Sequence, residues 1–148
     1  MRLVVPITVR WADLDAYGHV NNAAMLELLE EARVAVFWHG RHLPSDDPGG
    51  RTSRADTATF VAHQEIEYLA PLGYPAEPIP VSLWISKLGG ASAEVCYEVP
   101  TLDGGLAARA RTTIVMMDVA SGRPRRITES ERALWSRFID EPVVFRRG

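Results

Sequence analysis

A dense group of polar side chains lies near the N-terminus, in residues 10–22, which read R-W-A-D-L-D-A-Y-G-H-V-N-N. Residues 23–38 follow, and twelve of these sixteen are apolar, which predicts a helix. The first backbone N–H groups of a helix lack intrahelical acceptors, and the helix dipole favours negative charge there. Those amides could therefore hold a developing oxyanion, and a nearby carboxylate could act as nucleophile or general base toward a carbonyl compound.

The same residues also have simpler interpretations. Aspartate and asparagine before a helix most often serve as caps and turn residues, and His19 alone is typical of a hydrogen-bonded loop residue. Asp13, Asp15 and His19 could be imagined as metal ligands, but the remaining histidines are scattered, so no metal site is expected. Cys96 has no histidine at a recognisable offset, which disfavours a nucleophilic role.

The elements that must position this group follow from hydrophobic periodicity and turn residues. A strand is predicted over Leu3–Trp11, a helix over Ala23–Trp38 capped by Asn21 or Asn22, strands over Thr59–Leu69, Val81–Leu88, Ser92–Val99 and Leu106–Val119, and a short helix after the capping-box pair Thr128 and Glu131. The segment from Leu43 to about Arg54, rich in proline, glycine and aspartate, is expected to be the most mobile.

The first helix is apolar round most of its circumference, so burial on more than one side is expected. Apolar and polar side chains alternate along the strand Ser92–Val99, with Val95 and Tyr97 on one face and Glu94 and Cys96 on the other. This alternation predicts one buried and one solvent-exposed face. These features indicate an α+β fold in which one antiparallel sheet curls about one helix. Because such a sheet leaves edges to cover, a homodimer or a dimer of dimers is expected.

Length and composition limit the class of protein. The 148 residues, 47% of them apolar, fit a single domain spanning 1–148. One cysteine excludes an intrachain disulfide and suits a reducing cytoplasm, and neither a signal peptide nor a membrane span is recognisable. The net charge of −3 argues against nucleic acid as a partner, although residues 109–148 carry nine basic and five acidic side chains.

Taken together, residues 9–33 closely resemble the 4-hydroxybenzoyl-CoA thioesterase-like branch of the hotdog-fold acyl-CoA thioesterases. Members share the pattern D-x-D-x-x-G-H-V-N-N-x-x-Y-x-x-x-x-E-x-A-R, which this chain matches except for Met25 in place of tyrosine. Two further segments, Ile66–Pro71 and Lys87–Ser92, also resemble parts of the family. The resemblance covers nearly the whole chain, but only residues 9–33 match a specific family motif.

The resemblance implies a sheet of five or six strands wrapped around one long central helix, with dimerisation through the sheets and active sites at the subunit interface. It assigns catalysis to Asp15, as nucleophile or general base, and to the backbone N–H of Asn22, which polarises the thioester carbonyl. His19 is a possible minor contributor, Asp13 is a turn or cap residue, and Gly18 and Asn21 shape the loop. Met25 alters the lining of the acyl pocket. No cofactor is implied, since coenzyme A belongs to the substrate.

The coenzyme A moiety carries phosphates, so its binding should use basic groups and glycine-rich backbone. The candidates are Lys87, Gly89, Gly90 and Ser92 in one hairpin, together with Arg123, Arg125 and Arg126 after the last long strand, for which a solvated basic loop is an equal alternative. Two other functions remain open. One is a non-catalytic acyl or small-ligand-binding protein, and the other is an enoyl-CoA hydratase, whose asparagine-proline pair this sequence lacks.

Overall fold

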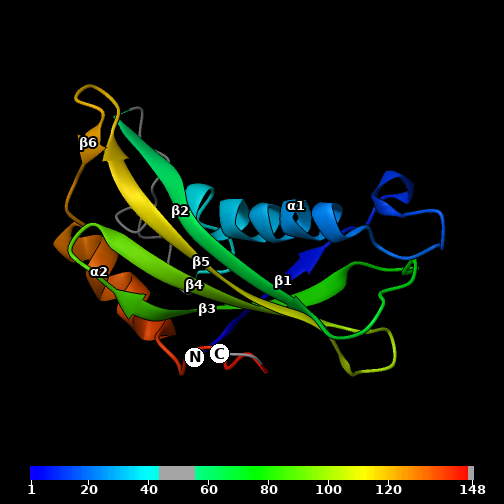
Figure 1. Cartoon of the computed structure of the whole chain (residues 1–148). Helices are drawn as coiled ribbons and strands as arrows, with labels where there is room; N and C mark the ends of the chain where they lie inside the picture. Colours follow the sequence, from blue (N-terminus) through cyan, green and yellow to red (C-terminus); the bar gives the residue numbers. More distant parts are fainter. Residues whose placement is uncertain (44–55, 147–148) are drawn as a thin grey trace.

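A computed structural model describes residues 1–43 and 56–146. In that part of the chain one antiparallel sheet curls around a long helix, α1 (Figure 1). Its strands are β1 (Leu3–Ile7), β2 (Thr57–Tyr68), β3 (Ile79–Leu88), β4 (Ser92–Pro100), β5 (Leu106–Asp118) and the short β6 (Arg123–Pro124). Their order is β1-β3-β4-β5-β2, with β6 pairing to β5, so β1 and β2 form the two edges.

The central helix confirms the helix predicted over 23–38. α1 spans Asn22–Arg33 and continues through a π-helical turn, Val34–Trp38. Its apolar side chains pack against the concave face of the sheet in the main core, and they include Met25, Leu28, Leu29, Ala32, Val36 and Phe37. Asn21 is the cap, because its side-chain oxygen accepts hydrogen bonds from the first turn.

The helix is nevertheless covered on fewer sides than its composition predicts. Ala23, Glu27 and Glu30 are exposed, and Trp38 keeps 39% of its surface in solvent. Glu27 and Glu30 face the open cavity between β1 and α1, whereas Trp38 lies beside Thr59 and Val61 of β2, the last strand of the sheet in the described residues. One face of α1 is therefore open within a single protomer.

The first strand is shorter than predicted. β1 ends at Ile7, and Trp11–Asp13 form one turn of 3-10 helix instead of continuing the strand to Trp11. The Asp13 carboxylate causes this turn, because Oδ2 accepts the backbone N–H of Arg10 at 2.7 Å and Oδ1 accepts the Arg10 guanidinium at 2.8 Å. A local side-chain bond thus replaces the strand ladder.

The outer face of β4 was predicted to be solvent-exposed, but the structure shows that it is partly buried. Cys96 is fully buried there, packed with Trp84 and Val143. The C-terminal segment 139–146 covers it, and the indole N–H of Trp84 donates to the carbonyl of Glu141 at 2.8 Å. Alternation along a strand therefore identified two faces correctly, but it could not show that a later segment covers the second face.

The C-terminal capping box is confirmed. Helix α2 spans Glu129–Trp135 with Thr128 as its cap, and a single 3-10 turn, Ser136–Phe138, follows it.

Apart from Leu43, the loop predicted to be mobile lies outside the described residues. None of the helices in the described residues has the length and apolar content of a membrane-crossing helix. A curled antiparallel sheet wrapped around one long helix is the hotdog fold, as predicted.

Candidate active site

The polar segment before α1 folds as a miniature hairpin. The N–H of Asn21 donates to the carbonyl of Asp13, and the N–H of Asp15 donates to the carbonyl of His19, both at 2.8 Å. At its tip Gly18 has a φ of +78°, a left-handed conformation that glycine adopts without strain. This hairpin places Asp15 and His19 opposite one another, just ahead of the helix.

The Asp15 carboxylate is half-buried and held by one oxygen. Oδ1 accepts the backbone N–H groups of Tyr17 at 2.8 Å and His19 at 3.2 Å. Among the described residues no donor binds Oδ2. The carboxylate is therefore oriented by the turn while its second oxygen stays available, which suits a nucleophile or general base.

The start of α1 leaves one amide available as well. The side-chain oxygen of Asn21 accepts the N–H groups of Ala23 at 2.8 Å and Ala24 at 3.3 Å. Within the described part of the chain, the N–H of Asn22 has no acceptor. A free amide at the positive end of a helix dipole is the donor that a developing oxyanion needs.

Asp13 has a different environment from Asp15. It is 1% exposed, and the hydrogen bond from the Arg10 side chain holds the pKa of its carboxyl below the ordinary value, against the opposing effect of burial. Both of its oxygens are occupied by Arg10. Asp13 is thus a turn residue, as expected from the resemblance.

Sequence reasoning missed one residue beside the helix start. Tyr68, at the end of β2, is 46% exposed, and its hydroxyl donates to the carbonyl of Asn22 at 2.5 Å. The next residues also hold the loop, because Leu72 accepts the N–H of Val20 at 2.8 Å and Gly73 pairs with His19. The family-like tract Ile66–Pro71 was the signal that pointed to this segment.

The expected coenzyme A hairpin lies at the other end of the sheet. β1 and the loop before α1 adjoin Ile79, where β3 begins, whereas Lys87, Gly89, Gly90 and Ser92 lie where β3 ends (Figure 1). The ten residues of β3 span roughly 30 Å at about 3.3 Å per residue. One protomer therefore brings Asp15, Gly18, His19, Asn21 and Asn22 together but not the hairpin residues, and Met25 is buried in the core.

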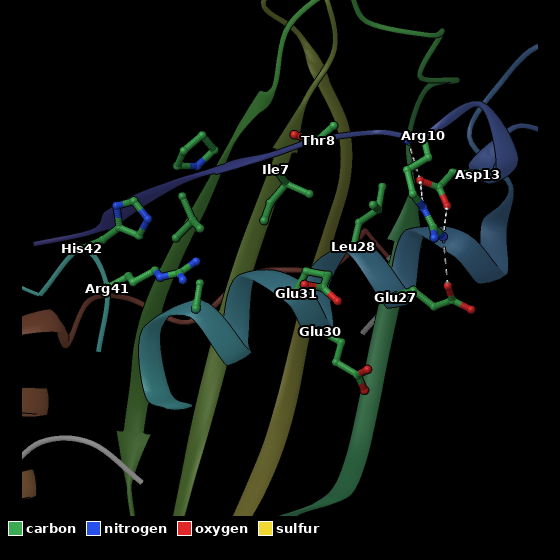
Figure 2. A pocket seen from close by; sticks show the side chains of 13 residues that line it. Ile7, Thr8, Arg10, Asp13, Glu27, Leu28, Glu30, Glu31, Arg41 and His42 are labelled. Atoms are coloured by element: carbon green, nitrogen blue, oxygen red, sulfur yellow. Dashed lines mark hydrogen bonds and ion pairs between the residues drawn. The ribbon is translucent and has the colours of Figure 1, made fainter. Parts of the chain in front are cut away.

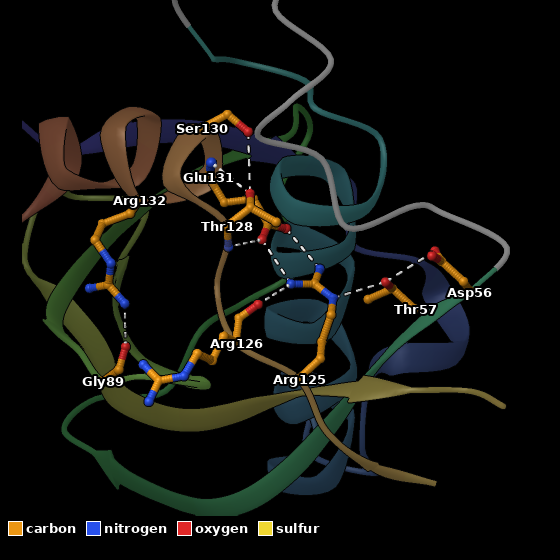
Figure 3. A network of polar contacts seen from close by, with 9 residues as sticks. All are labelled: Asp56, Thr57, Gly89, Arg125, Arg126, Thr128, Ser130, Glu131 and Arg132. Carbon is orange, nitrogen blue, oxygen red and sulfur yellow. Dashed lines mark hydrogen bonds and ion pairs between the residues drawn. The ribbon is translucent and has the colours of Figure 1, made fainter. Parts of the chain in front are cut away.

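The segment after β5 packs against that distant hairpin (Figure 3). Arg125 forms two 2.9 Å bonds to the buried carboxylate of Glu131, and its Nε donates to Thr57 at 3.0 Å. This pairing contradicts the expectation that Arg125 serves a phosphate, because its charge is already neutralised inside the protein. Arg132 of α2 donates to the carbonyl of Gly89 at 2.7 Å, which ties α2 to the hairpin.

A cavity of about 750 Å³ opens between β1 and α1 (Figure 2). Asp15, His19 and Asn22 are not among the residues that line it. Glu27, Glu30 and Glu31 line its helix side, and Arg10, Arg41 and His42 line it as well, so the cavity carries charges of both signs. In the described residues no group of three or more His, Cys, Asp or Glu side chains could hold a metal ion.

The fold and the loop define a class of protein: a hotdog protein with an oriented carboxylate in front of a free helix amide. Comparison with known proteins agrees, because the thioesterase-like superfamily model matches residues 9–138. The chain belongs to this superfamily and is a thioester hydrolase.

Individual relatives are similar over most of their length. FadM, a long-chain acyl-CoA thioesterase of Escherichia coli (strain K12), is 34% identical over 115 residues, which are 76% of this chain and 81% of FadM. A thioesterase of Thermus thermophilus, solved with coenzyme A and Zn, is 30% identical with a TM-score of 0.69, covering 89% of this chain and 95% of that one. The PA2801 protein of Pseudomonas aeruginosa is 32% identical with a TM-score of 0.73, covering 88% and 95%.

Proposed function

We propose that this enzyme is an acyl-CoA thioesterase in which Asp15 and the backbone N–H of Asn22 carry out the chemistry. The observation that carries the proposal is the pair of free groups at the start of α1, namely the second carboxylate oxygen of Asp15 and the unpaired amide of Asn22. The substrate class is supported by the two relatives whose names include acyl-CoA or coenzyme A.

The proposed reaction begins when the thioester carbonyl oxygen accepts the N–H of Asn22. Asp15 then either attacks the carbonyl carbon, forming a mixed anhydride that water hydrolyses, or removes a proton from a water molecule that attacks instead. In both routes the carbon–sulfur bond breaks and coenzyme A leaves as a thiolate, which takes its proton from Asp15 in the general-base route and from solvent water in the nucleophilic route. His19 lies across the hairpin from Asp15 and contributes at most weakly near the acyl carbonyl, while Met25 helps to shape the acyl pocket.

The active site is proposed to be completed by a second copy of the chain paired along β2. β1 is a poor edge for pairing because it has five residues and contains Pro6. β2 has twelve residues without proline, and its Phe60 and Val61 are exposed by 61% and 37%. A long apolar edge of this kind is the natural place for strand-to-strand association.

Pairing of two β2 strands antiparallel across a twofold axis would also solve the separation of the two predicted half-sites. The Tyr68 end of β2 lies beside Asn22, and the Thr59 end lies beside the β3–β4 hairpin, since Thr59 and Ser92 pair with neighbouring residues of β5. Antiparallel pairing brings opposite ends together. Asp15 of one protomer would then face the hairpin Lys87–Ser92 of its partner.

The enzyme is expected to be a cytoplasmic homodimer or homotetramer. A cytoplasmic enzyme is expected because the single cysteine forms no intrachain disulfide. A dimer through β2 leaves the choice between dimer and tetramer to be measured in solution.

A thiol-release assay over aromatic, branched and straight-chain acyl-CoAs tests the function. Wild type should cleave at least one substrate, and Asp15→Asn should reduce kcat by about 100-fold or more. Asp103→Asn, which changes an exposed aspartate in the β4–β5 turn, is the matched control and should keep activity. Binding without release by wild type would favour the non-catalytic alternative, hydration of an enoyl-CoA would favour the hydratase, and full activity of Asp15→Asn would remove Asp15 from catalysis.

A further inference from the structure

The C-terminal segment 139–146 crosses the outer face of the sheet over several strands. It begins at β3, where the N–H of Asp140 donates to the carbonyl of Ile85 at 2.9 Å. It reaches β2, where the N–H of Arg146 donates to Oε2 of Glu67 at 3.0 Å. Because β3, β4, β5 and β2 are neighbours in that order, the segment spans four strands on the face opposite α1 (Figure 1).

The segment follows one row of side chains across these strands. Trp84 of β3 pairs in register with Cys96 of β4, and Cys96 pairs with Arg111 of β5. Arg111 in turn pairs with Glu65 of β2. Residues that pair directly across strands lie on the same face of a sheet. Glu67, two positions further along β2, also lies on this face because side chains alternate with a period of two.

Packing holds the segment against the row. Val143 packs with Trp84 and Cys96, and the ring centroid of Phe145 lies 5.3 Å from the guanidinium carbon of Arg111. The hydrogen bond to β2 follows one residue after Phe145. The segment is therefore fixed on β3, β4 and β5 before it reaches the edge strand.

Glu67 joins the segment to the end of β2. Its Oε1 accepts the Nε of Arg109, its partner in register on β5, at 2.8 Å, while Oε2 accepts the N–H of Arg146. In the described residues β2 has a neighbouring strand only on its β5 side. The C-terminal segment thus adds a restraint to an edge strand that β5 alone would hold.

Tyr68 follows Glu67 and points to the opposite face of the sheet. Its hydroxyl donates to the carbonyl of Asn22 at 2.5 Å. Asn22 also carries the backbone N–H proposed to bind the thioester oxygen. Two successive residues of β2 are therefore fixed, Glu67 by the C-terminal segment on the outside and Tyr68 by the start of α1 on the inside.

We propose that the C-terminal segment positions the thioester site by holding Glu67, so that the Tyr68 hydroxyl stays against the Asn22 carbonyl. This inference rests on the proposed function, because it assigns the segment a role in placing the Asn22 amide. Arg146 and Glu67 are positioning residues, since both act through Tyr68. Misplacing a reacting group by about 1 Å can cost about 100-fold in rate, so even a small shift should be measurable.

A backbone donor can be removed with a matched control at the same position. Arg146→Pro eliminates the N–H that binds Glu67, whereas Arg146→Ala keeps it. Arg146→Pro should lower kcat about threefold, within the range of one hydrogen bond, and leave KM unchanged. Arg146→Ala should match wild type. Thiol release from the acyl-CoA that wild type cleaves best measures both constants, and light scattering should give one mass for all three proteins.

Removing the acceptor provides a second variant. Glu67→Ala deletes the carboxylate that binds both Arg109 and the segment, so kcat should fall at least as far as in Arg146→Pro. Glu65→Ala is the control, because it breaks the neighbouring ion pair with Arg111 and has no hydrogen bond to the segment in the described residues. An equal loss of kcat in Glu65→Ala would assign the effect to lost surface charge and overturn the inference.

A double variant tests whether the effect passes through Tyr68. In Tyr68→Phe/Arg146→Pro the hydrogen bond that the segment protects is already absent, so kcat should equal that of Tyr68→Phe alone. Losses that multiply in the double variant would mean that the segment acts by another route, and the positioning role would be rejected.

Two further measurements do not depend on turnover. Hydrogen exchange in the peptide that covers the start of α1 should be faster in Arg146→Pro than in Arg146→Ala. Labelling of Cys96 by DTNB should stay as slow as in wild type in both variants, because Val143 still covers it. Fast labelling in Arg146→Pro would show that the whole segment detaches, which would overturn a local effect at Glu67.

These measurements separate the two proposals. If wild type hydrolyses no acyl-CoA while the difference in hydrogen exchange persists, the proposed reaction is rejected and the positioning contact is retained. If wild type is active but Arg146→Pro changes neither kcat nor hydrogen exchange, the positioning role alone is rejected.

Discussion

The hydroxyl of Tyr68 donates a 2.5 Å hydrogen bond to the carbonyl of Asn22, joining the end of an edge strand to the first residue of the central helix. These residues are 46 positions apart in the chain. Asn22 also carries the free amide of the candidate site, so the tyrosine fixes the peptide units next to the proposed oxyanion donor. This contact links the sheet edge to the first residue of the proposed site.

Tyr68→Phe should therefore lower kcat several-fold while KM changes little. The variant keeps the ring and removes only the hydrogen bond, whose loss should cost about 1 kcal/mol of stability. Steady-state kinetics and chemical denaturation measure the two effects. Tyr74→Phe is the control, because Tyr74 is exposed and packs edge-on against Trp11. An unchanged kcat for Tyr68→Phe would show that the helix start needs no such support.

The β2 edge should control both assembly and activity. Phe60→Asp places a charge on the exposed apolar edge and should convert the expected dimer to monomer, with loss of activity, because the two half-sites then separate. Light scattering after size-exclusion chromatography gives the mass. Val4→Asp, at an exposed position of the opposite edge strand, should leave the dimer intact. A Phe60→Asp variant that stays dimeric would point to a different interface.

Acid should destabilise the fold through two buried carboxylates. Hydrogen bonds from Arg10 lower the pKa of Asp13. Burial acts to raise the pKa of Glu131, but hydrogen bonds from Arg125 and from the backbone of Thr128 together bring it below the ordinary value. A carboxyl whose folded-state pKa is depressed adds stability above its unfolded pKa and loses it as pH falls through the folded value. The free energy of unfolding should therefore drop between about pH 5 and about pH 2.

Glu131→Gln isolates one of these contributions. It removes the charge that neutralises Arg125, so unfolding should become easier by roughly 3 kcal/mol at neutral pH, as for other broken buried ion pairs. Urea denaturation at several pH values should show a flatter acid dependence than wild type. Glu129→Gln, on the exposed side of the same helix, should match wild type, and an equal loss there would mean that helix charge alone is responsible.

Cys96 should be inert in the folded protein. Burial raises the pKa of its thiol, and Val143 covers it from the C-terminal segment. A thiol reagent such as DTNB should therefore label it slowly under native conditions and rapidly in denaturant. Val143→Asp should speed the native reaction by loosening that cover, whereas Val144→Asp, at a largely exposed position, should not. Fast labelling of wild type would contradict the burial.

Several features of this protein follow from the sequence because they depend on neighbours along the chain. The helix cap, expected at Asn21 or Asn22 and found at Asn21, and the capping box of Thr128 and Glu131 use contacts over a few residues, so spacing predicts them within a residue. The long helix and the strands follow from their apolar periods. The resemblance of residues 9–33 led to the correct fold and enzyme class.

The tertiary structure alone decided which distant groups meet. Alternation in β4 identifies two faces, but only the folded chain shows that residues near Val143 cover the face with Cys96. Likewise, a run of arginines does not reveal that Glu131 neutralises Arg125 while Arg126 stays free. These outcomes depend on contacts between remote segments, and a local pattern contains no information about which segment will lie across from it.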